Sequence, residues 1–377
     1  MAQWRQRVAL QAWSPALTPH FKSRRHLPLS HSPTLPLSQS PLSALRGLSL
    51  PIFALRLQSV FFMPKLHLEK SLVLCFTLAL ITAPFCKAAD AAAYVVADST
   101  TGTILESSNP SKKLQIGSLT KIATAMVVLD WSASRSGDLT ALAGIPDSAL
   151  PIGTPQGVGF EPGESCSVRD LLYAALMQSD NVAAIALANH VGKALGGSTG
   201  NAAPVITFVV QMNALARRLG MTHTRFINPH GLDQLETTLP YSTAEDLAKL
   251  TSYAMANSAF RFYVSQKERK IAISGGASGQ RSYLLRNTNE LLGINAIDGV
   301  KTGNTTRAGQ CVIISAAKAP ESRQQGETHI VTPRRLNVVV LNSGNRFDFA
   351  VALLDRGWRL YEKWSAAGRP KNWTAPR

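Results

Sequence analysis

The spacing of apolar residues changes twice along this chain, and the order of those changes limits the folds open to it. Two short strand-like runs, 93–98 and 103–107, are separated by a turn sequence typical of a β-hairpin. Residues from about 140 to 270 then follow the helical period for most of their length. Strand-like runs return at 309–317 and 335–343. The order along the chain is therefore strands, helices, strands.

Two helices at the ends of this arrangement complete it. The first is expected to begin near Ser118, and its apolar positions repeat at helical spacing: Ile122, Ala123, Met126, Val127 and Leu129. The last periodic element, 348–364, is amphipathic. We expect the early and late strands to form one antiparallel sheet that these two helices cover. The predicted fold class is α/β, with an inserted all-α region between the strands.

The first 89 residues are not expected to belong to this fold. Residues 1–62 are rich in Ser, Pro, Leu and Arg and show neither period. Residues 63–89 resemble a secretory signal peptide, with early lysines, an apolar run at 71–82 and the small-x-small pattern Cys86-Lys87-Ala88. The apolar run is too short for a bilayer, which needs roughly 20 residues. We expect the signal to be cleaved, and a true start at Met63 would make the preceding stretch a misassignment.

Composition supports one folded domain after this leader. Apolar residues make up 45% of the chain and charged residues 16%, which is enough apolar material for a large core. The net charge is +16, but residues 1–89 hold ten Lys/Arg and one Glu, so 16 − 9 leaves +7 for the rest. That part has no dense basic run with interleaved aromatic residues, so we expect no nucleic-acid partner. Residues 90–366 form the expected domain and 367–377 a short tail.

Cysteine and histidine usage gives no metal signature. Cys166 and Cys311 remain after the leader, far apart and without a CxxC spacing, and no HExxH pair occurs. We therefore expect no metal, and the Gly-rich segments "GGSTG" and "GGASGQ" lack the context of a phosphate-binding loop, so we expect no cofactor either. Whether the two cysteines pair stays open at this point.

The first motif with chemical meaning is Ser118-Leu119-Thr120-Lys121. On a helix, residues three apart share a face, so Lys121 can reach the Ser118 hydroxyl. A serine becomes a good nucleophile when a neighbouring base takes its proton, and a lysine can be that base when burial lowers its pKa. Ser315 and Lys318 have the same spacing. They fall in a strand-like run, where residues three apart point to opposite faces, so we interpret them as a chance match.

The second motif, Ser179-Asp180-Asn181, interrupts two strongly apolar helical runs. A polar triplet at such a place is typical of a corner that faces a cleft, although an ordinary turn between helices explains it equally well. The pattern Ser-x-Asn alone is weak, because Ser107 and Ser343 begin two further copies.

The third motif is Lys301-Thr302-Gly303, which occurs once. On an edge strand it offers an ammonium group, a hydroxyl and a backbone that no side chain obstructs. An extended peptide can add to such an edge through backbone hydrogen bonds. A hairpin start with a solvated lysine is the alternative.

Taken together and in this order, the three motifs are the signature of penicillin-binding proteins and class A β-lactamases. The chain resembles the low-molecular-mass penicillin-binding proteins that act as serine D-alanyl-D-alanine carboxypeptidases (peptidase family S11). The likeness covers roughly residues 91–365 and includes the segments "INPHGLD", "YSTAEDLAKL" and "NAIDGVKTGNTTRAGQCVIISA". It implies the β-lactamase/transpeptidase-like fold, in agreement with the predicted layout.

The resemblance implies a catalytic role for three side chains. Ser118 attacks the carbonyl between two terminal D-alanines of a peptidoglycan stem peptide and becomes acylated. Lys121 is the general base, and Ser179 relays a proton to the leaving amine. β-Lactam antibiotics would acylate the same serine as covalent inhibitors.

It also implies substrate-binding roles for residues around them. Asn181 orients the substrate backbone and helps to hold Lys121. Lys301 and Thr302 bind the terminal carboxylate, Gly303 keeps the strand accessible, and the backbone N–H of Asn304 joins that of Ser118 in an oxyanion hole. Arg346, expected just past the last strand, is placed like a carboxylate-binding arginine of relatives.

Several alternatives remain beside a carboxypeptidase. A D-alanyl endopeptidase acting on cross-links would use the same site. A class A β-lactamase needs a glutamate that activates water, but no Asp or Glu lies between Asp180 and Asp233. An inactive wall-binding relative is the third. The resemblance predicts a periplasmic or secreted enzyme, and the short tail after the last helix predicts no membrane anchor. The polar segment 319–334 is expected to be a long loop of unassigned role.

Overall fold

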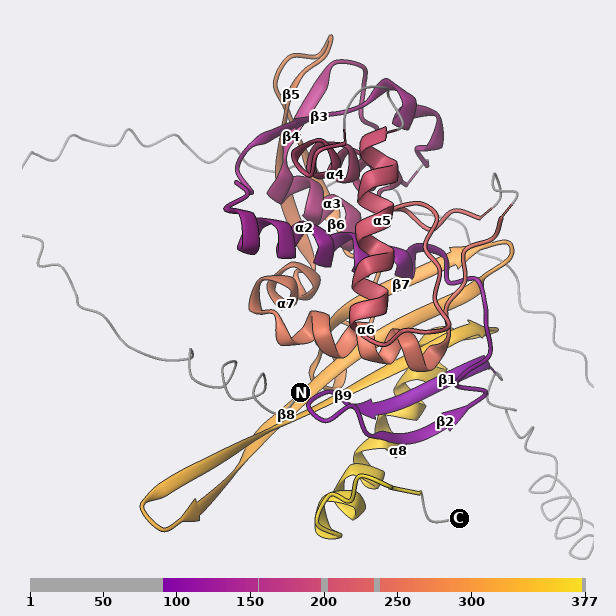
Figure 1. The fold of residues 1–377 in the computed structure, drawn as a ribbon, viewed down its shortest axis with the longest axis vertical. Helices are drawn as coiled ribbons and strands as arrows, with labels where there is room; N and C mark the ends of the chain where they lie inside the picture. Colours follow the sequence, from indigo (N-terminus) through magenta and orange to yellow (C-terminus); the bar gives the residue numbers. More distant parts are fainter. Residues whose placement is uncertain (1–90, 155, 198–202, 234–237, 375–377) are drawn as a thin grey trace, which may run out of the picture. The chain divides into compact units, whose positions relative to one another are not determined.

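The computed structural model of the protein describes residues 91–154, 156–197, 203–233 and 238–374. The signal peptide expected at 63–89, and the stretch before it, lie outside the described residues. Figure 1 shows how the described elements are arranged.

The main sheet confirms the predicted pairing of early with late strands. It has five antiparallel strands, and their order is β2 (Ile104–Ser108), β1 (Ala91–Asp98), β9 (Thr328–Ser343), β8 (Gly309–Gln325) and β7 (Ile297–Thr305). The register pairs Val95 with Val339 and Lys301 with Ile313. β7 lies at one edge of the sheet, as predicted for the strand that carries Lys301-Thr302-Gly303.

The central strands are almost continuously apolar because both faces of the sheet are covered. On β9, Val339 and Leu341 belong to the larger core, which includes the helices on one face. Val338 and Val340 belong to a second core under helix α8 (Arg346–Ala366). Alternate residues of one strand therefore stabilise two opposite layers.

Helix α8 closes the second layer and confirms the predicted last helix. Asn345 caps its start by accepting a hydrogen bond from the Asp348 backbone N–H. Its buried face includes Trp358, Tyr361 and Trp364, which pack on the sheet as a run of edge-to-face aromatic pairs.

The region between β2 and β7 is mainly helical, as expected. Its first helical turn, η1, is a 3₁₀ turn (Gly117–Thr120) that continues directly into α2 (Lys121–Arg135). The other helices are α3 (Val168–Met177), α4 (Asn181–Ala194), α5 (Ala203–Arg218), α6 (Ala244–Ala256) and α7 (Ser258–Ser265). Thr243 caps the start of α6, because its side chain accepts a hydrogen bond from the Asp246 N–H.

This inserted region is not entirely α-helical, because it also contains a second antiparallel sheet. Its strands, in sheet order, are β3 (Leu142–Gly144), β4 (Glu164–Ser167), β5 (Glu268–Gly275) and β6 (Arg281–Arg286). β3 and β4 are three and four residues long, too short for a clear alternating pattern in the sequence. The expectation of an all-α insertion is corrected in this respect.

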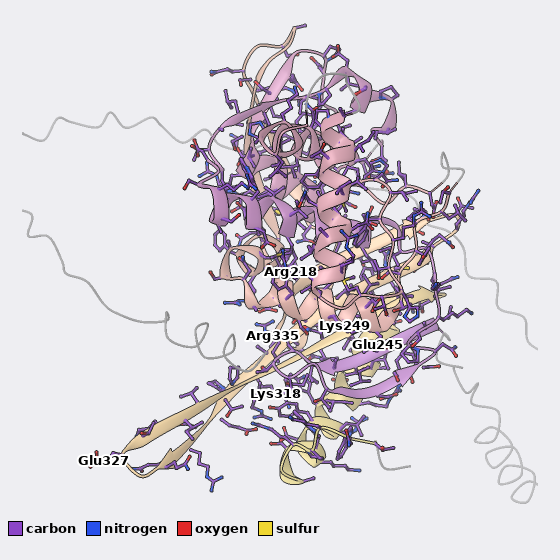
Figure 2. The ribbon with its side chains drawn as sticks, viewed as in Figure 1. Arg218, Glu245, Lys249, Lys318, Glu327 and Arg335 are labelled. Carbon is purple, nitrogen blue, oxygen red and sulfur yellow. The ribbon has the colours of Figure 1, made fainter. Side chains whose placement is uncertain are left out.

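The segment expected to be a long loop at 319–334 is instead the outer part of a β-hairpin. Pairing between β8 and β9 continues to Gln325 and Thr328 at the tip. We call residues 317–335 the ribbon. Figure 2 shows Glu327 at its far end and Lys318 and Arg335 at its base.

Two further observations concern the length of the helices and the cysteines. Within the described ranges, no helix combines the length and apolarity that a bilayer span requires. Cys166 on β4 and Cys311 on β8 are free, buried thiols rather than a disulfide.

Candidate active site

Ser118 and Lys121 lie on one turn where η1 passes into α2. The Lys121 Nζ is 2.9 Å from the Ser118 Oγ, 2.8 Å from the Asn181 Oδ1 and 2.8 Å from the backbone carbonyl oxygen of His230. The predicted proximity of the serine and the lysine is therefore present, and Asn181 joins them from a helix 60 residues further along the chain.

Lys121 is fully buried, and no carboxylate forms a salt bridge with it among the described residues. Burial lowers the pKa of Lys121 to about 7, although the nearby Asp180 carboxylate acts in the opposite direction. A lysine with this pKa is neutral in a large fraction of molecules at physiological pH. The physical condition for a lysine base is met.

Ser179-Asp180-Asn181 forms the corner between α3 and α4, as predicted. Asp180 caps α4 by accepting a hydrogen bond from the Ala183 N–H at 2.7 Å, and it also accepts one from the Val158 N–H at 2.8 Å. Asn181 is the first residue of α4, and its Nδ2 donates to the Ile152 carbonyl at 3.3 Å. That bond turns the Asn181 Oδ1 toward Lys121.

Ser179 has a left-handed backbone, with φ of 64°, which is uncommon for a serine. It is half-buried, and within the described part of the chain its hydroxyl has no hydrogen-bond partner. Hydrogen bonds therefore hold the Asn181 side chain in place. The left-handed backbone at Ser179 sets the direction of that side chain.

A tight loop provides the third contact of Lys121. The Asn228 side chain accepts from the Gly231 N–H and donates to the Leu232 carbonyl, which closes the loop around His230. Gly231 has φ of 87°, and a Cβ there would lie 2.0 Å from the Gly117 carbonyl oxygen. Only glycine fits this position, so the loop packs directly against the turn that carries Ser118.

Lys301, Thr302 and Gly303 lie on the edge strand β7, next to η1. Lys301 is buried, and its pKa is lowered well below the usual value, first by burial and then by the positive charges of Lys121 and Arg346. The Thr302 hydroxyl lies 2.7 Å from the hydroxyl of Thr288. The edge strand therefore adds a second buried lysine amine to the site.

Gly303 and Gly117 allow the two predicted oxyanion donors to approach each other. A Cβ on Gly303 would lie 3.3 Å from the Ser118 backbone N, and one on Gly117 would lie 3.4 Å from the Asn304 backbone N. Strand β7 and turn η1 are therefore in close contact at Ser118. The Asn304 side chain itself is exposed.

Arg346 lies just past the last strand, as expected, and is the first residue of α8. Its Nη1 donates to the Gly303 carbonyl at 3.1 Å, so it does reach the edge strand. Burial lowers the pKa of Arg346 below its usual value. A carboxylate near Gly303 would meet Arg346 and Lys301 together.

The positions of Ser315 and Lys318 confirm that their Ser-x-x-Lys spacing is a chance match. The buried Ser315 hydroxyl donates to the Asn337 Oδ1 at 2.8 Å inside the sheet. Lys318 lies on the ribbon, 4.6 Å from the ring centre of Trp358 on the α8 side. For metals, the described residues hold no group of three His, Cys, Asp or Glu side chains placed to bind an ion.

Sequence reasoning missed the residues that support this site. The His230 carbonyl was not predicted, because a main-chain acceptor leaves no residue-type signal; the tight "NPHGL" sequence was its only trace. Thr305 was also missed. Its hydroxyl donates to the buried Asp233 Oδ2 at 2.8 Å and accepts from the Ala308 N–H at 3.0 Å.

Three comparisons relate this chain to known proteins. The family model described as D-alanyl-D-alanine carboxypeptidase matches residues 81–324. D-alanyl-D-alanine carboxypeptidase DacC of Escherichia coli is 32% identical over 72% of this chain, and the match spans 62% of DacC. A D-alanyl-D-alanine endopeptidase of Pseudomonas aeruginosa is 32% identical over 70% of this chain and 75% of its own length. The crystal structure of the Streptomyces K15 DD-transpeptidase has a TM-score of 0.61 at 29% identity, covering 71% of this chain and 97% of that one.

Proposed function

The chain belongs to the D-alanyl-D-alanine carboxypeptidase family (peptidase S11), and from this premise we propose that it removes the terminal D-alanine from peptidoglycan stem peptides through an acyl-enzyme on Ser118. The observation that carries the proposal is the hydrogen bonding of the buried Lys121, whose Nζ contacts the Ser118 Oγ and two oxygens that can only accept.

These contacts determine where the lone pair of a neutral Lys121 points. A neutral amine has two N–H groups and one lone pair. The Asn181 Oδ1 and the His230 carbonyl take the two N–H groups, so the lone pair faces the Ser118 hydroxyl, which can donate. Ser118 then loses its proton to Lys121 while its Oγ bonds to the carbonyl carbon.

The scissile C–N bond breaks next, and the leaving D-alanine amine needs a proton. Lys121 holds the proton taken from Ser118, and we assign Ser179 to pass it on. The Ser118 and Asn304 backbone N–H groups stabilise the developing oxyanion, a contribution typically worth about 3 kcal/mol. Water then releases the shortened peptide and regenerates Ser118.

The terminal carboxylate of the substrate is assigned to the far end of the site. Lys301 and Arg346 supply the positive charge there, and Thr302 supplies a hydroxyl. A carboxylate between the two cations would raise the lowered pKa of Lys301 and keep that side chain protonated when substrate is bound.

We also infer slow turnover of β-lactam antibiotics and action outside the cytoplasm. No Asp or Glu lies between Asp180 and Asp233, where a class A β-lactamase needs its deacylating glutamate. The penicilloyl-enzyme should therefore persist. The signal-like segment 63–89 supports a periplasmic or secreted location.

The similarity to an endopeptidase of Pseudomonas aeruginosa favours one second candidate, cleavage of D-alanyl cross-links. One experiment distinguishes a carboxypeptidase, an endopeptidase and an inactive protein. The protein is incubated with soluble stem pentapeptide and, separately, with cross-linked dimer, and the products are read by mass. We expect loss of one alanine from the pentapeptide, and none with Ser118→Ala. Splitting of the dimer alone would make the protein an endopeptidase, and no product from either would refute the proposal.

A further inference from the structure

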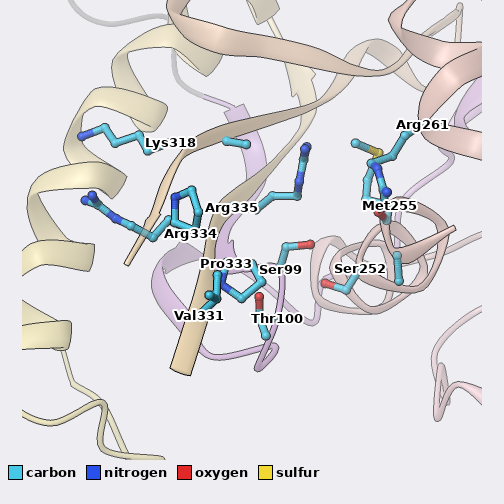
Figure 3. A pocket seen from close by; sticks show the side chains of 13 residues that line it. Ser99, Thr100, Ser252, Met255, Arg261, Lys318, Val331, Pro333, Arg334 and Arg335 are labelled. Atoms are coloured by element: carbon cyan, nitrogen blue, oxygen red, sulfur yellow. Dashed lines mark hydrogen bonds between the residues drawn. The ribbon is translucent and has the colours of Figure 1, made fainter. Parts of the chain in front are cut away.

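A cavity of about 720 Å³ lies at the base of the ribbon, away from the residues around Ser118. Its walls come from the β1–β2 turn, from α6 and α7, and from the ribbon. Figure 3 shows Met255 and Arg261 on one side and Val331, Pro333 and Arg335 on the other. This volume lies in the range of small-ligand and peptide-binding pockets, roughly 300–1,000 Å³.

Among the described residues, four cationic side chains and no carboxylate line this cavity, but two of the cations already form ion pairs elsewhere. Lys318 and Arg334 turn toward α8, where both pair with Glu362 and approach the ring of Trp358. Their positive charge is largely neutralised on that side.

Arg335 and Arg261 are the cations that face the cavity. Arg335 holds Asp298 with two hydrogen bonds, of 2.6 and 2.7 Å. The Arg261 guanidinium donates to the Met255 carbonyl and makes no ion pair with any described carboxylate. The cavity therefore keeps one positive charge that the described residues do not neutralise.

The remaining lining suits an extended ligand with both polar and apolar parts. The Ser252 hydroxyl accepts a hydrogen bond from the Asn337 side chain at 3.1 Å, which leaves its own proton free to donate. Val331 presents an apolar wall and is 59% exposed. Pro320 and Pro333 lack an N–H, so the ribbon beside the cavity is a poor template for strand addition and side chains must make the contacts.

We propose that this cavity is a second binding site for a carboxylate-bearing peptide, namely another stem peptide of the same wall polymer. The inference rests on the proposed function. Stem peptides carry free carboxylates for Arg261 and alanine methyl groups for the apolar wall. A polymer with many identical stems can occupy the active site and this cavity together, and a second weak contact then raises the overall affinity without altering the chemistry.

The test compares two variants of the cavity lining with a control variant on the opposite face of the ribbon. In the inactive Ser118→Ala protein, Arg261→Gln removes the free charge, and Val331→Glu places a negative charge on the cavity wall. Ile330→Glu is the control, because it introduces the same charge at the residue just before Val331. Ile330 is 43% exposed but points to the opposite face of the ribbon. Each variant is mixed with purified insoluble peptidoglycan at moderate salt, and the sedimented fraction gives the binding constant.

We expect Arg261→Gln and Val331→Glu to weaken binding about threefold to fivefold, the range for one exposed charge contact, and Ile330→Glu to leave it unchanged. With Ser118 restored, all three variants should release D-alanine from soluble pentapeptide at the unmodified rate. Equal binding by all variants, equal loss in all three, or slower pentapeptide turnover would overturn the second site. Failure of the proposed function would appear separately, as no pentapeptide turnover by the unmodified protein.

Discussion

At the scale of single residues, the site depends on a lysine that burial keeps close to neutrality. Burial removes water from around the Lys121 amine, which instead makes three hydrogen bonds within the protein. Burial also lowers the pKa of Lys121 to about 7. A solvated lysine near its usual pKa would be protonated at neutral pH and unable to accept the Ser118 proton. The helical spacing of the two residues brings them together, but only burial suits the lysine to its proposed role as the base.

A pH dependence of acylation follows. Below pH 7 Lys121 gains a proton, so the rate of Ser118 acylation by a fluorescent penicillin should fall about tenfold per pH unit, and above pH 7 it should level off. Stopped-flow labelling between pH 5.5 and 8.5 measures this profile. A flat profile across that range would show that Lys121 does not act as the base.

At the scale of elements, the site is held by contacts between segments distant in the chain. Edge strand β7, turn η1 and the loop around His230 meet where Gly117, Gly231 and Gly303 leave room for close backbone approach. Thr305 connects the end of β7 to Asp233, the residue that follows this loop. The three elements therefore hold the proposed nucleophile, base and oxyanion donors together as one unit.

Gly303→Ala tests the contact between β7 and η1. The added Cβ would lie 2.8 Å from the Ile116 carbonyl oxygen, so the strand must move away from the nucleophile and its Asn304 N–H with it. We expect penicillin acylation to slow by about 100-fold or more, the cost of losing an oxyanion donor. Gly144→Ala, where a Cβ meets nothing within 4 Å, is the matched control. Equal rates in both variants would contradict the assigned oxyanion hole.

Thr305→Val tests the link between β7 and Asp233. The substitution keeps the shape of the side chain but leaves the buried Asp233 carboxylate without its hydroxyl donor, so the free energy of unfolding should fall by about 1–3 kcal/mol. Thr305→Ser retains the hydroxyl and should cost less. Urea unfolding of both variants measures the difference, and a valine variant as stable as the serine variant would remove the role given to this bond.

The sequence predicted those parts of the site that depend on local spacing. Ser118 with Lys121, the corner at Ser179 and the edge strand at Lys301 each follow from periodicity and residue type. The His230 carbonyl and the Thr305–Asp233 bond could not be predicted, because they arise only when distant segments pack. The ribbon at 317–335 was missed for a related reason: most of its residues are exposed, so its strands are largely polar and lack the alternating apolar pattern.

At the scale of the whole molecule, the helices that cover the two faces of the main sheet have different roles. The helices on one face carry Lys121 and Asn181, whereas α8 on the other face seals the sheet and contributes Arg346. The ribbon extends the same two central strands beyond both layers and forms one wall of the proposed second site.

The expected removal of the signal peptide also concerns the chain as a whole. Cleavage after Ala88 or close to it should leave a mature protein that begins near residue 89, just before β1. Mass spectrometry of the amino terminus of the protein from its native envelope measures this. Peptides from residues 1–62 in that sample would refute both the cleaved signal and the start at Met63.

The central claim is that Ser118 is the nucleophile of one site assembled from three motifs. Peptide mass mapping after exposure to penicillin tests it most directly, because trypsin should release Ser118 in the peptide "LQIGSLTK". We predict one penicilloyl group on Ser118 in the unmodified protein and no labelled peptide in Ser118→Ala. A label on Ser315 or any other residue, or a label that survives Ser118→Ala, would contradict the account.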